Sequence, residues 1–192
     1  MNQIKEKVNP ITLRSKSLIV KSLIELMDKK PYSEITLKEI AENADLTRQT
    51  VYRNFAKKEA ILEYYVDGFY NDFINAISAK NDITLYDLLI TYFEYWYENR
   101  EFLKKLVDNN VYQILLDLHL KYLSSMATDE NFKDLTFVSN NSYFNHFSAG
   151  GLWFALKKWV EDDTEKTPKE MTNIILNFYQ VKGLNVKDMK RE

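Results

Sequence analysis

The chain has 192 residues, and 45% of them are hydrophobic, which is enough to form a folded core. Four glycines and three prolines are too few for the many turns of a β-rich fold, so the composition favours long helices. The sequence contains no cysteine, which excludes disulfide scaffolds, zinc-thiolate fingers and thiol redox sensing.

The net charge of −2 conceals an uneven distribution along the chain. Residues 1–58 hold 12 Lys and Arg against 7 Asp and Glu, a net +5, whereas residues 59–192 hold 14 against 21, a net −7. A basic N-terminal part suits binding to a phosphate backbone, and the acidic remainder suits solubility or a small-molecule site. No apolar run has the length of a signal peptide or a membrane span, so we expect a cytoplasmic protein.

In chain order, the first expected features are an arm and a helix. Residues 1–13 are expected to form a basic arm, either a frayed terminus or a segment that touches phosphates beside the main contact. Apolar residues then recur at three- and four-residue steps over 13–29, which predicts an amphipathic helix. Pro31 ends this helix, because proline breaks the helical hydrogen-bond pattern.

Two short helices separated by a tight turn are expected next. Thr36 and Glu39 have the spacing of a capping box, which starts a helix that ends near residue 43. Thr47 can cap a second helix that runs to residue 54, and Asp45 in the turn tolerates a left-handed backbone. Two helices joined so tightly must cross steeply, which is the helix-turn-helix arrangement.

The remaining segments are also expected to be helical. Apolar stripes, capping residues and polar breaks delimit helices at 58–78, 84–99, 101–107, 112–126, 141–160 and 168–180. The expected fold class is therefore all-α. The sequence carries no phosphate loop, nucleophile-elbow pattern or metal-binding quartet, so we expect neither an enzyme nor a bound cofactor.

Residues 14–62 resemble the N-terminal domain of the TetR (tetracycline-repressor-like) family of transcription regulators. The segments that match are Ile35-Thr36-Leu37-Lys38-Glu39-Ile40-Ala41, Leu46-Thr47-Arg48-Gln49-Thr50-Val51-Tyr52-Arg53-Asn54-Phe55 and Lys58-Glu59-Ala60-Ile61-Leu62. A further segment is similar to the penultimate helix of some members, namely Phe147-Ser148-Ala149-Gly150-Gly151.

The resemblance implies two domains: a helix-turn-helix DNA-binding domain with a basic N-terminal arm over residues 1–58, and a helical effector-binding and dimerisation domain over 59–192. It implies a homodimer, formed through about 141–160 and 168–180, that binds a near-palindromic operator. It further implies a regulator, most often a repressor, that a small-molecule effector releases from DNA. Two alternatives are open: a TetR-like activator or co-regulator switched by a protein partner, and a haem sensor.

The helix-turn-helix supplies the candidate DNA contacts. Three apolar side chains of this motif can face the core: Leu46, Val51 and Phe55. Gln49 can pair with adenine and Arg48 or Arg53 with guanine, while residues near helix N-termini suit phosphates. In the family, the lysine that opens the next helix contacts a backbone phosphate, and here it is Lys58. The full set of candidate contacts is Thr36, Thr47, Arg48, Gln49, Thr50, Tyr52, Arg53, Asn54 and Lys58.

Aromatic side chains are abundant in residues 59–192, and the polar tips of many suit a pocket for an apolar or aromatic effector. Core packing is the ordinary interpretation of any one of them. The candidate pocket residues are Phe69, Phe73, Tyr92, Trp96, Tyr112, His119, His146 and Phe147. His119 and His146 could together hold a haem iron, but no carboxylate–histidine spacing supports a metal site.

Overall fold

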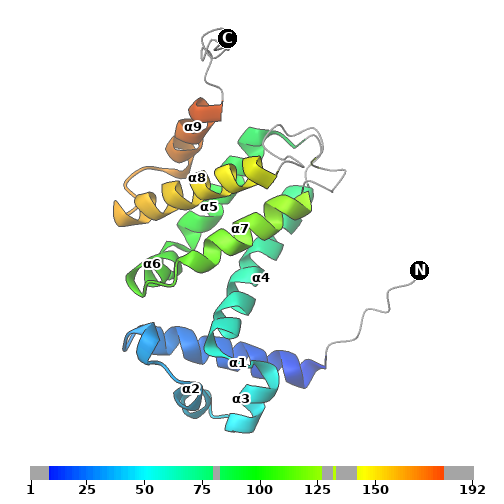
Figure 1. Ribbon diagram of the computed structural model, residues 1–192, viewed down its shortest axis with the longest axis vertical. Helices are drawn as coiled ribbons and strands as arrows, with labels where there is room; N and C mark the ends of the chain where they lie inside the picture. The colour runs from blue at the N-terminus through cyan, green and yellow to red at the C-terminus, as the bar shows by residue number, and fades with distance from the viewer. Residues whose placement is uncertain (1–8, 80–82, 127–131, 133–141, 180–192) are drawn as a thin grey trace, which may run out of the picture. The chain divides into compact units, whose positions relative to one another are not determined.

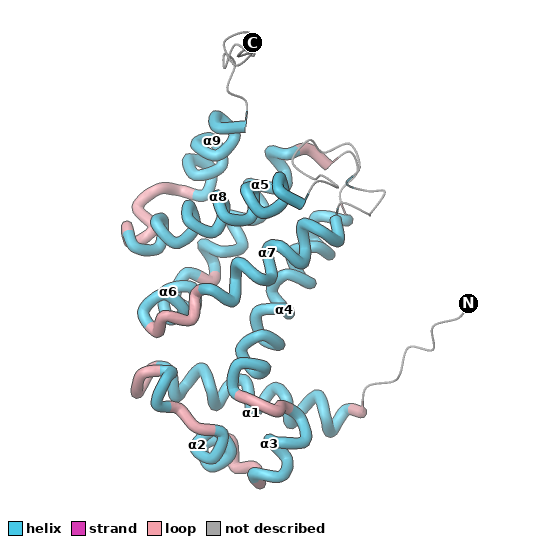
Figure 2. Tube along the Cα trace, viewed as in Figure 1, coloured by secondary structure: helices cyan, strands magenta, loops and turns pink. Residues whose placement is uncertain are grey.

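The computed structural model describes residues 9–79, 83–126, 132 and 142–179. Within these ranges all regular structure is helical, which confirms the expected all-α fold (Figures 1 and 2). The elements in chain order are α1 (Pro10–Met27), a short 3₁₀ helix η1 (Tyr32–Glu34), α2 (Leu37–Asn43), α3 (Arg48–Asn54), α4 (Lys58–Ser78), α5 (Leu85–Glu98), α6 (Arg100–Asp108), α7 (Gln113–Met126), α8 (Ser142–Glu161) and α9 (Pro168–Tyr179).

The first helix begins earlier than the sequence analysis expected. Residues 1–13 were expected to form an arm, but α1 starts at Pro10. The side chain of Asn9 accepts a 3.0 Å hydrogen bond from the backbone N–H of Ile11 and thereby caps the helix. Proline suits the first helical position, because its φ is already helical and its missing N–H would have no partner there. The expectation of an arm is therefore wrong from residue 10 onward, and residues 1–8 lie outside the described part of the chain.

Packing divides the chain into two compact units. The first comprises the chain up to Tyr70 together with Lys105–Ile114, and the second comprises Asn71–Lys104 and the chain from Leu115 onward. Three helices, α4, α6 and α7, contribute residues to both units. The first unit thus combines α1, α2 and α3 with the first part of α4 and the turn between α6 and α7.

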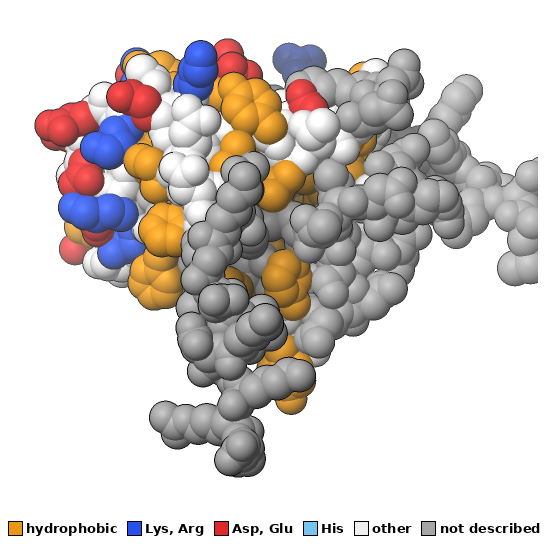
Figure 3. Space-filling view, turned by 90° about the horizontal axis from the view of Figure 1, so that it is seen from above, with side chains coloured by type: hydrophobic (Ala, Val, Ile, Leu, Met, Phe, Trp, Pro, Cys, Tyr) orange, Lys and Arg blue, Asp and Glu red, His pale blue; other side chains and the backbone are white. Residues whose placement is uncertain are grey.

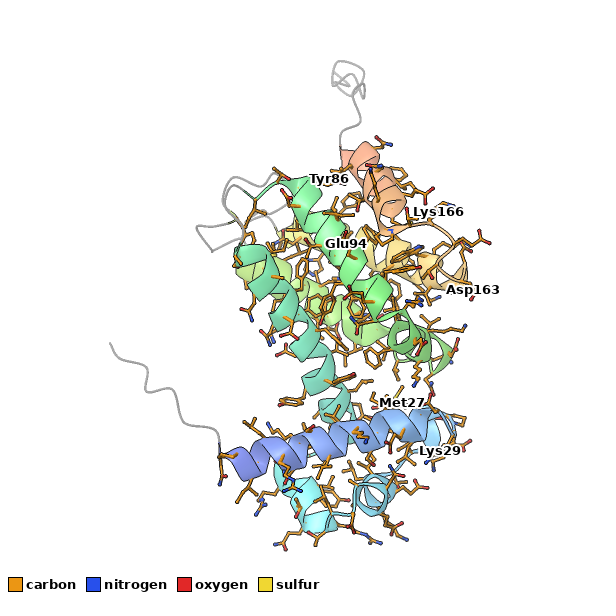
Figure 4. The ribbon with its side chains drawn as sticks, turned by 180° about the vertical axis from the view of Figure 1, so that it is seen from behind. Met27, Lys29, Tyr86, Glu94, Asp163 and Lys166 are labelled. Atoms are coloured by element: carbon orange, nitrogen blue, oxygen red, sulfur yellow. The ribbon has the colours of Figure 1, made fainter. Side chains whose placement is uncertain are left out.

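In the first unit, α1 packs against α2 and α3. Ile19 and Leu23 on α1, Ile40 on α2 and Val51 on α3 are all 0% exposed and form the core of this unit. Burying such a side chain contributes about 1.5–3 kcal/mol. The hydroxyl of Ser22 donates a 2.9 Å hydrogen bond to the carbonyl oxygen of Ile40, which fixes α1 against α2. The loop toward α2 begins beyond Met27 and includes Lys29, and Figure 4 labels both residues at this end of α1.

The second unit has an aromatic core. α5 packs against α9, and its buried face carries Phe93 and Trp96. The ring of Phe93 meets the indole of Trp159 on α8 edge to face, with centroids 5.5 Å apart. Trp159 donates a 2.8 Å hydrogen bond from Nε1 to the carbonyl oxygen of Lys166. This bond ties α8 to the loop before α9, in which Figure 4 labels Asp163 and Lys166.

Helix starts in the second unit are set by local side chains. Thr84 caps α5 by accepting a 3.1 Å hydrogen bond from the N–H of Asp87, whose carboxylate bonds back to the threonine. Thr167 and Glu170 form the same arrangement before α9, in which Pro168 is the first residue. The structure confirms both helix starts that the sequence predicted.

Candidate DNA-binding site

The turn between α2 and α3 has the left-handed backbone expected at Asp45. The φ of Asp45 is 53°, in a region that aspartate tolerates better than most residues. The N–H of Leu46 donates to the carbonyl of Ala41 at 2.9 Å, and the N–H of Asp45 donates to that of Glu42 at 3.3 Å. These two bonds form a Schellman motif, which ends α2 abruptly. The chain can therefore start α3 within a few residues and at a steep angle.

α2 starts at the capping box expected from Thr36 and Glu39. Thr36 Oγ1 accepts a hydrogen bond from the Glu39 N–H at 3.3 Å, and Glu39 Oε2 accepts one from the Thr36 N–H at 3.0 Å. Lys30 forms a 2.5 Å ion pair with the other carboxylate oxygen of Glu39. Hydrogen bonds from Lys30 and Thr36 lower the pKa of Glu39 to about 2. The carboxylate is therefore ionised at neutral pH and the capping box is intact.

α3 separates an apolar face from a polar one. Val51 is 0% exposed, Phe55 just beyond the helix is 5% exposed, and Leu46 is half-buried. On the other side, five of the predicted DNA contacts are exposed: Thr47, Arg48, Gln49, Tyr52 and Arg53. Thr36, at the N-terminus of α2, is exposed as well. The structure therefore presents these six side chains at the surface, where they are accessible to DNA.

Two other predicted contacts are engaged within α3 itself. Thr50 is half-buried, and its hydroxyl lies 2.9 Å from the capping hydroxyl of Thr47. The side-chain amide of Asn54 is also half-buried and donates a 2.8 Å hydrogen bond to the carbonyl oxygen of Thr50. Both residues stabilise the helix ends, so the exposed side chains are the better candidates for reaching DNA.

Lys58, which the resemblance assigns to a phosphate, has an unexpected environment. It is half-buried at the start of α4, and its Nζ donates to the carbonyl oxygens of Tyr32, Ser33 and Ile35 at 2.6, 3.1 and 3.0 Å. An ammonium group has three N–H donors. The protein itself thus fills the hydrogen-bonding capacity of this side chain.

Tyr92 is the centre of an aromatic cluster inside the second unit. Its ring meets those of Phe73 and Trp96 edge to face, with centroids 6.2 and 6.5 Å apart. Its hydroxyl lies 2.6 Å from Nε2 of His119. All four side chains are buried. The structure therefore brings together half of the predicted effector residues, and we call Phe73, Tyr92, Trp96 and His119 the Tyr92 cluster.

The two histidines lie in different surroundings. Burial lowers the pKa of His119 to about 3, so the ring is neutral at physiological pH. His146 is exposed on α8, where its Nδ1 lies 2.6 Å from the carbonyl oxygen of Ser142. The structure thus does not present the two histidines as the paired ligands that the haem alternative needs.

The other predicted effector residues lie outside the Tyr92 cluster. Phe147, a candidate pocket residue, is 74% exposed on α8 and does not belong to the buried Tyr92 cluster. Phe69 is half-buried and Tyr112 is buried, and both belong to the first unit. A pattern of aromatic residues alone could not assign these side chains to one unit or the other.

α8 carries an apolar stripe at its surface, which the sequence analysis did not single out. Tyr143, Phe147 and Phe154 are 87%, 74% and 66% exposed, and their spacing of four and seven residues places them on one helical face. Gly150 and Gly151 lie between Phe147 and Phe154 in the sequence, and apart from the adjoining backbone of α8 itself a Cβ atom added at either position would meet no atom within 4 Å. Figure 3 shows apolar side chains beside charged ones on the face of the molecule that it draws. We call Tyr143, Phe147 and Phe154 the α8 stripe.

Neither a metal centre nor a membrane-crossing helix is found in the part of the chain that the structure describes. Among the described residues, no three His, Asp or Glu side chains are grouped so that they could hold a metal ion. Within those same ranges, no helix combines the length and the apolar character needed to cross a membrane.

The site and the fold together define a class of protein. A helix-turn-helix with an exposed polar recognition face, joined to a second helical unit with an aromatic core, is the architecture of a DNA-binding transcription regulator. Residues 19–65 match the family described as bacterial regulatory proteins, tetR family, and residues 83–180 match the transcriptional regulator C-terminal region. The chain belongs to the TetR family, whose members bind DNA and typically dimerise and bind small-molecule effectors.

Similarity to individual proteins extends over most of the chain. This chain is 24% identical to the HTH-type dhaKLM operon transcriptional activator DhaS of Lactococcus lactis over 169 residues, which cover 84% of this chain and 89% of the relative. A solved structure described as the dihydroxyacetone kinase operon activator DhaS has a TM-score of 0.55 and 22% identity, over 86% of this chain and 94% of that one. The structural likeness supports the fold.

Proposed function

We propose that this protein acts in the cytoplasm as a homodimeric transcription regulator that binds a near-palindromic operator and is released from it by an effector. The exposed polar face of α3, backed by the buried Val51 and Phe55, carries the proposal. In a homodimer two such faces enter successive major grooves, so the operator should hold two half-sites about 34–36 Å apart.

The exposed residues at this site divide into those proposed to contact DNA bases and those proposed to contact the DNA phosphate backbone. Gln49 and Arg53 are exposed and have the hydrogen-bonding groups that read adenine and guanine in the major groove. Arg48 is also exposed, and Glu42 holds its guanidinium with N and O atoms 3.7 Å apart. Thr36 and Thr47 are the N-caps of α2 and α3, and Tyr52 is exposed on α3. We propose that these three side chains bind phosphate oxygens.

We propose that the dimer forms through α8 and α9. The α8 stripe places large apolar side chains in solvent, and Phe178 on α9 is 72% exposed. Exposed apolar patches mark interaction surfaces in soluble proteins. The two open glycines on α8 would let a partner helix approach closely.

The effector is proposed to be a small apolar or aromatic molecule that binds beside the Tyr92 cluster. Aromatic walls with a few polar groups are typical of such sites, and the pair formed by Tyr92 and His119 supplies a hydroxyl and a neutral imidazole. Because α4 contributes residues to both units, a shift of this helix could carry the response to the DNA-binding unit. Repression relieved by the effector is the direction of control that we propose first.

Replacing Gln49 with alanine should change operator preference more than general DNA affinity. A bidentate contact to one adenine discriminates by about 1–3 kcal/mol, and only at that base pair. The probe is the duplex that the wild-type protein enriches from a random pool, together with all its single-base variants. Tyr52→Phe is the matched control, because losing a phosphate contact should weaken binding to every duplex equally. Uniform losses for Gln49→Ala would contradict base readout.

Activation is the second candidate function, and a specific observation favours it. The Lactococcus relative that matches most of the chain is named as an operon transcriptional activator. In that case a protein partner that binds an exposed apolar face is the alternative switch. A reporter gene placed behind the enriched operator separates the two directions. Deleting the gene for this protein should raise reporter expression for a repressor and lower it for an activator.

A further inference from the structure

The loop between α1 and α2, residues 28–36, lies against the first residue of α4. We propose that Lys58 is a positioning residue that fixes this loop, and through it the N-terminus of α2, in the shape required for binding DNA. Lys58 then makes no phosphate contact of its own. This role differs from the one that family resemblance implies for a lysine at the start of α4.

The geometry around the ammonium group supports this assignment. Nζ donates to three carbonyl oxygens within a stretch of four residues, at 2.6 Å to Tyr32, 3.1 Å to Ser33 and 3.0 Å to Ile35. It also lies 4.4 Å from the ring centroid of the buried Tyr32, a cation–π distance. A flexible stem that ends in three rotatable donors suits three converging acceptors.

A phosphate contact would compete with these bonds. Lys58 is the first residue of α4, where the helix dipole disfavours a positive charge. The three carbonyl dipoles and the tyrosine ring offset that repulsion. An ammonium that turned toward DNA would leave those carbonyls without this donor, and hydrogen bonds to charged groups are among the more stabilising ones.

The same loop positions a predicted DNA contact. The carbonyl of Ile35, held by Lys58, belongs to the peptide bond that joins Ile35 to Thr36, the N-cap of α2. At the other end, the N–H of Tyr32 donates a 2.7 Å hydrogen bond to Oδ1 of Asn109 in the α6–α7 turn. Both peptide groups flanking Tyr32 are thus held. A loop fixed before DNA arrives lowers the ordering cost of binding.

Three variants test the proposal on the duplex that the wild-type protein enriches from a random pool. Lys58→Met should weaken binding at least tenfold while the slope of log affinity against log salt stays unchanged, because no phosphate contact is lost. A lost phosphate contact would lower that slope by about 0.9. Lys58→Arg should also bind weakly, because a planar guanidinium cannot direct its donors onto three converging carbonyls. Lys57→Met removes a neighbouring exposed charge and is the matched control.

A second measurement uses the free protein and needs no operator. The N–H of Ile35 donates to the carbonyl of Tyr32 at 3.1 Å, and the N–H of Glu34 to that of Pro31 at 3.0 Å. Lys58→Met should speed hydrogen exchange of these two amides at least tenfold, and Lys57→Met should leave it unchanged. Should Lys58→Met fail to fold, Lys58→Arg keeps the charge and carries both measurements. Unchanged exchange, a reduced salt slope or wild-type binding by Lys58→Arg would each overturn the proposal.

Discussion

Replacing Phe147 with glutamate should convert the protein to a monomer and remove most of its affinity for the operator. Phe147 is 74% exposed at the centre of the α8 stripe, so the substitution leaves the core of the chain intact. In the proposed dimer the new carboxylate would be buried in an apolar interface, where an unpaired charge is strongly disfavoured. Light scattering should then give the mass of one chain, 22.8 kDa, in place of two.

The loss of DNA affinity follows from the loss of the second recognition helix. Two linked half-site contacts bind about 10²–10⁴ times more tightly than one, so the monomer should bind the two-half-site duplex weaker by that factor. Tyr86→Glu is the matched control, because Tyr86 is also an exposed aromatic of the second unit but lies on α5. Circular dichroism should show equal helix content for all three proteins. A dimeric Phe147→Glu would place the interface elsewhere.

The helix-turn-helix was predictable because its signals are local. The capping box joins residues three positions apart, and the Schellman motif at Asp45 joins residues within five positions. Each of these bonds depends on side-chain types that can be identified in the sequence. The start of α1 at Pro10 could have been found in the same way, because Asn9 followed by proline is a recognised helix start.

The features that sequence reasoning missed depend on contacts between distant residues. Lys58 reaches carbonyls 23–26 positions earlier in the chain, and backbone acceptors leave no mark in the sequence. Phe147 was expected to line an effector pocket because aromatic side chains are abundant in residues 59–192. Ser148, Ala149 and Leu152 are the side that is buried, while the aromatic α8 stripe faces solvent. Neither periodicity nor composition decides between two such faces.

His119 should make the stability of the fold depend on pH between 7 and 5. Burial lowers its pKa to about 3 in the folded chain, whereas an unfolded histidine titrates near 6.5. As the pH falls below about 6.5, the unfolded chain takes up a proton that the folded chain does not. The free energy of unfolding should therefore fall by about 2 kcal/mol between pH 7 and pH 5, and further until the folded pKa is reached.

Replacing His119 with glutamine should remove this part of the pH dependence. The amide does not titrate, yet it can still form a hydrogen bond with the Tyr92 hydroxyl that now lies 2.6 Å from the imidazole. Urea unfolding at fixed protein concentration, at pH 7, 6 and 5, should give a flatter curve for the variant than for the wild type. Tyr92→Phe leaves His119 buried and should keep the wild-type slope. Parallel curves for wild type and His119→Gln would mean that His119 is protonated or hydrated within the fold, and that the second unit opens to water around the Tyr92 cluster.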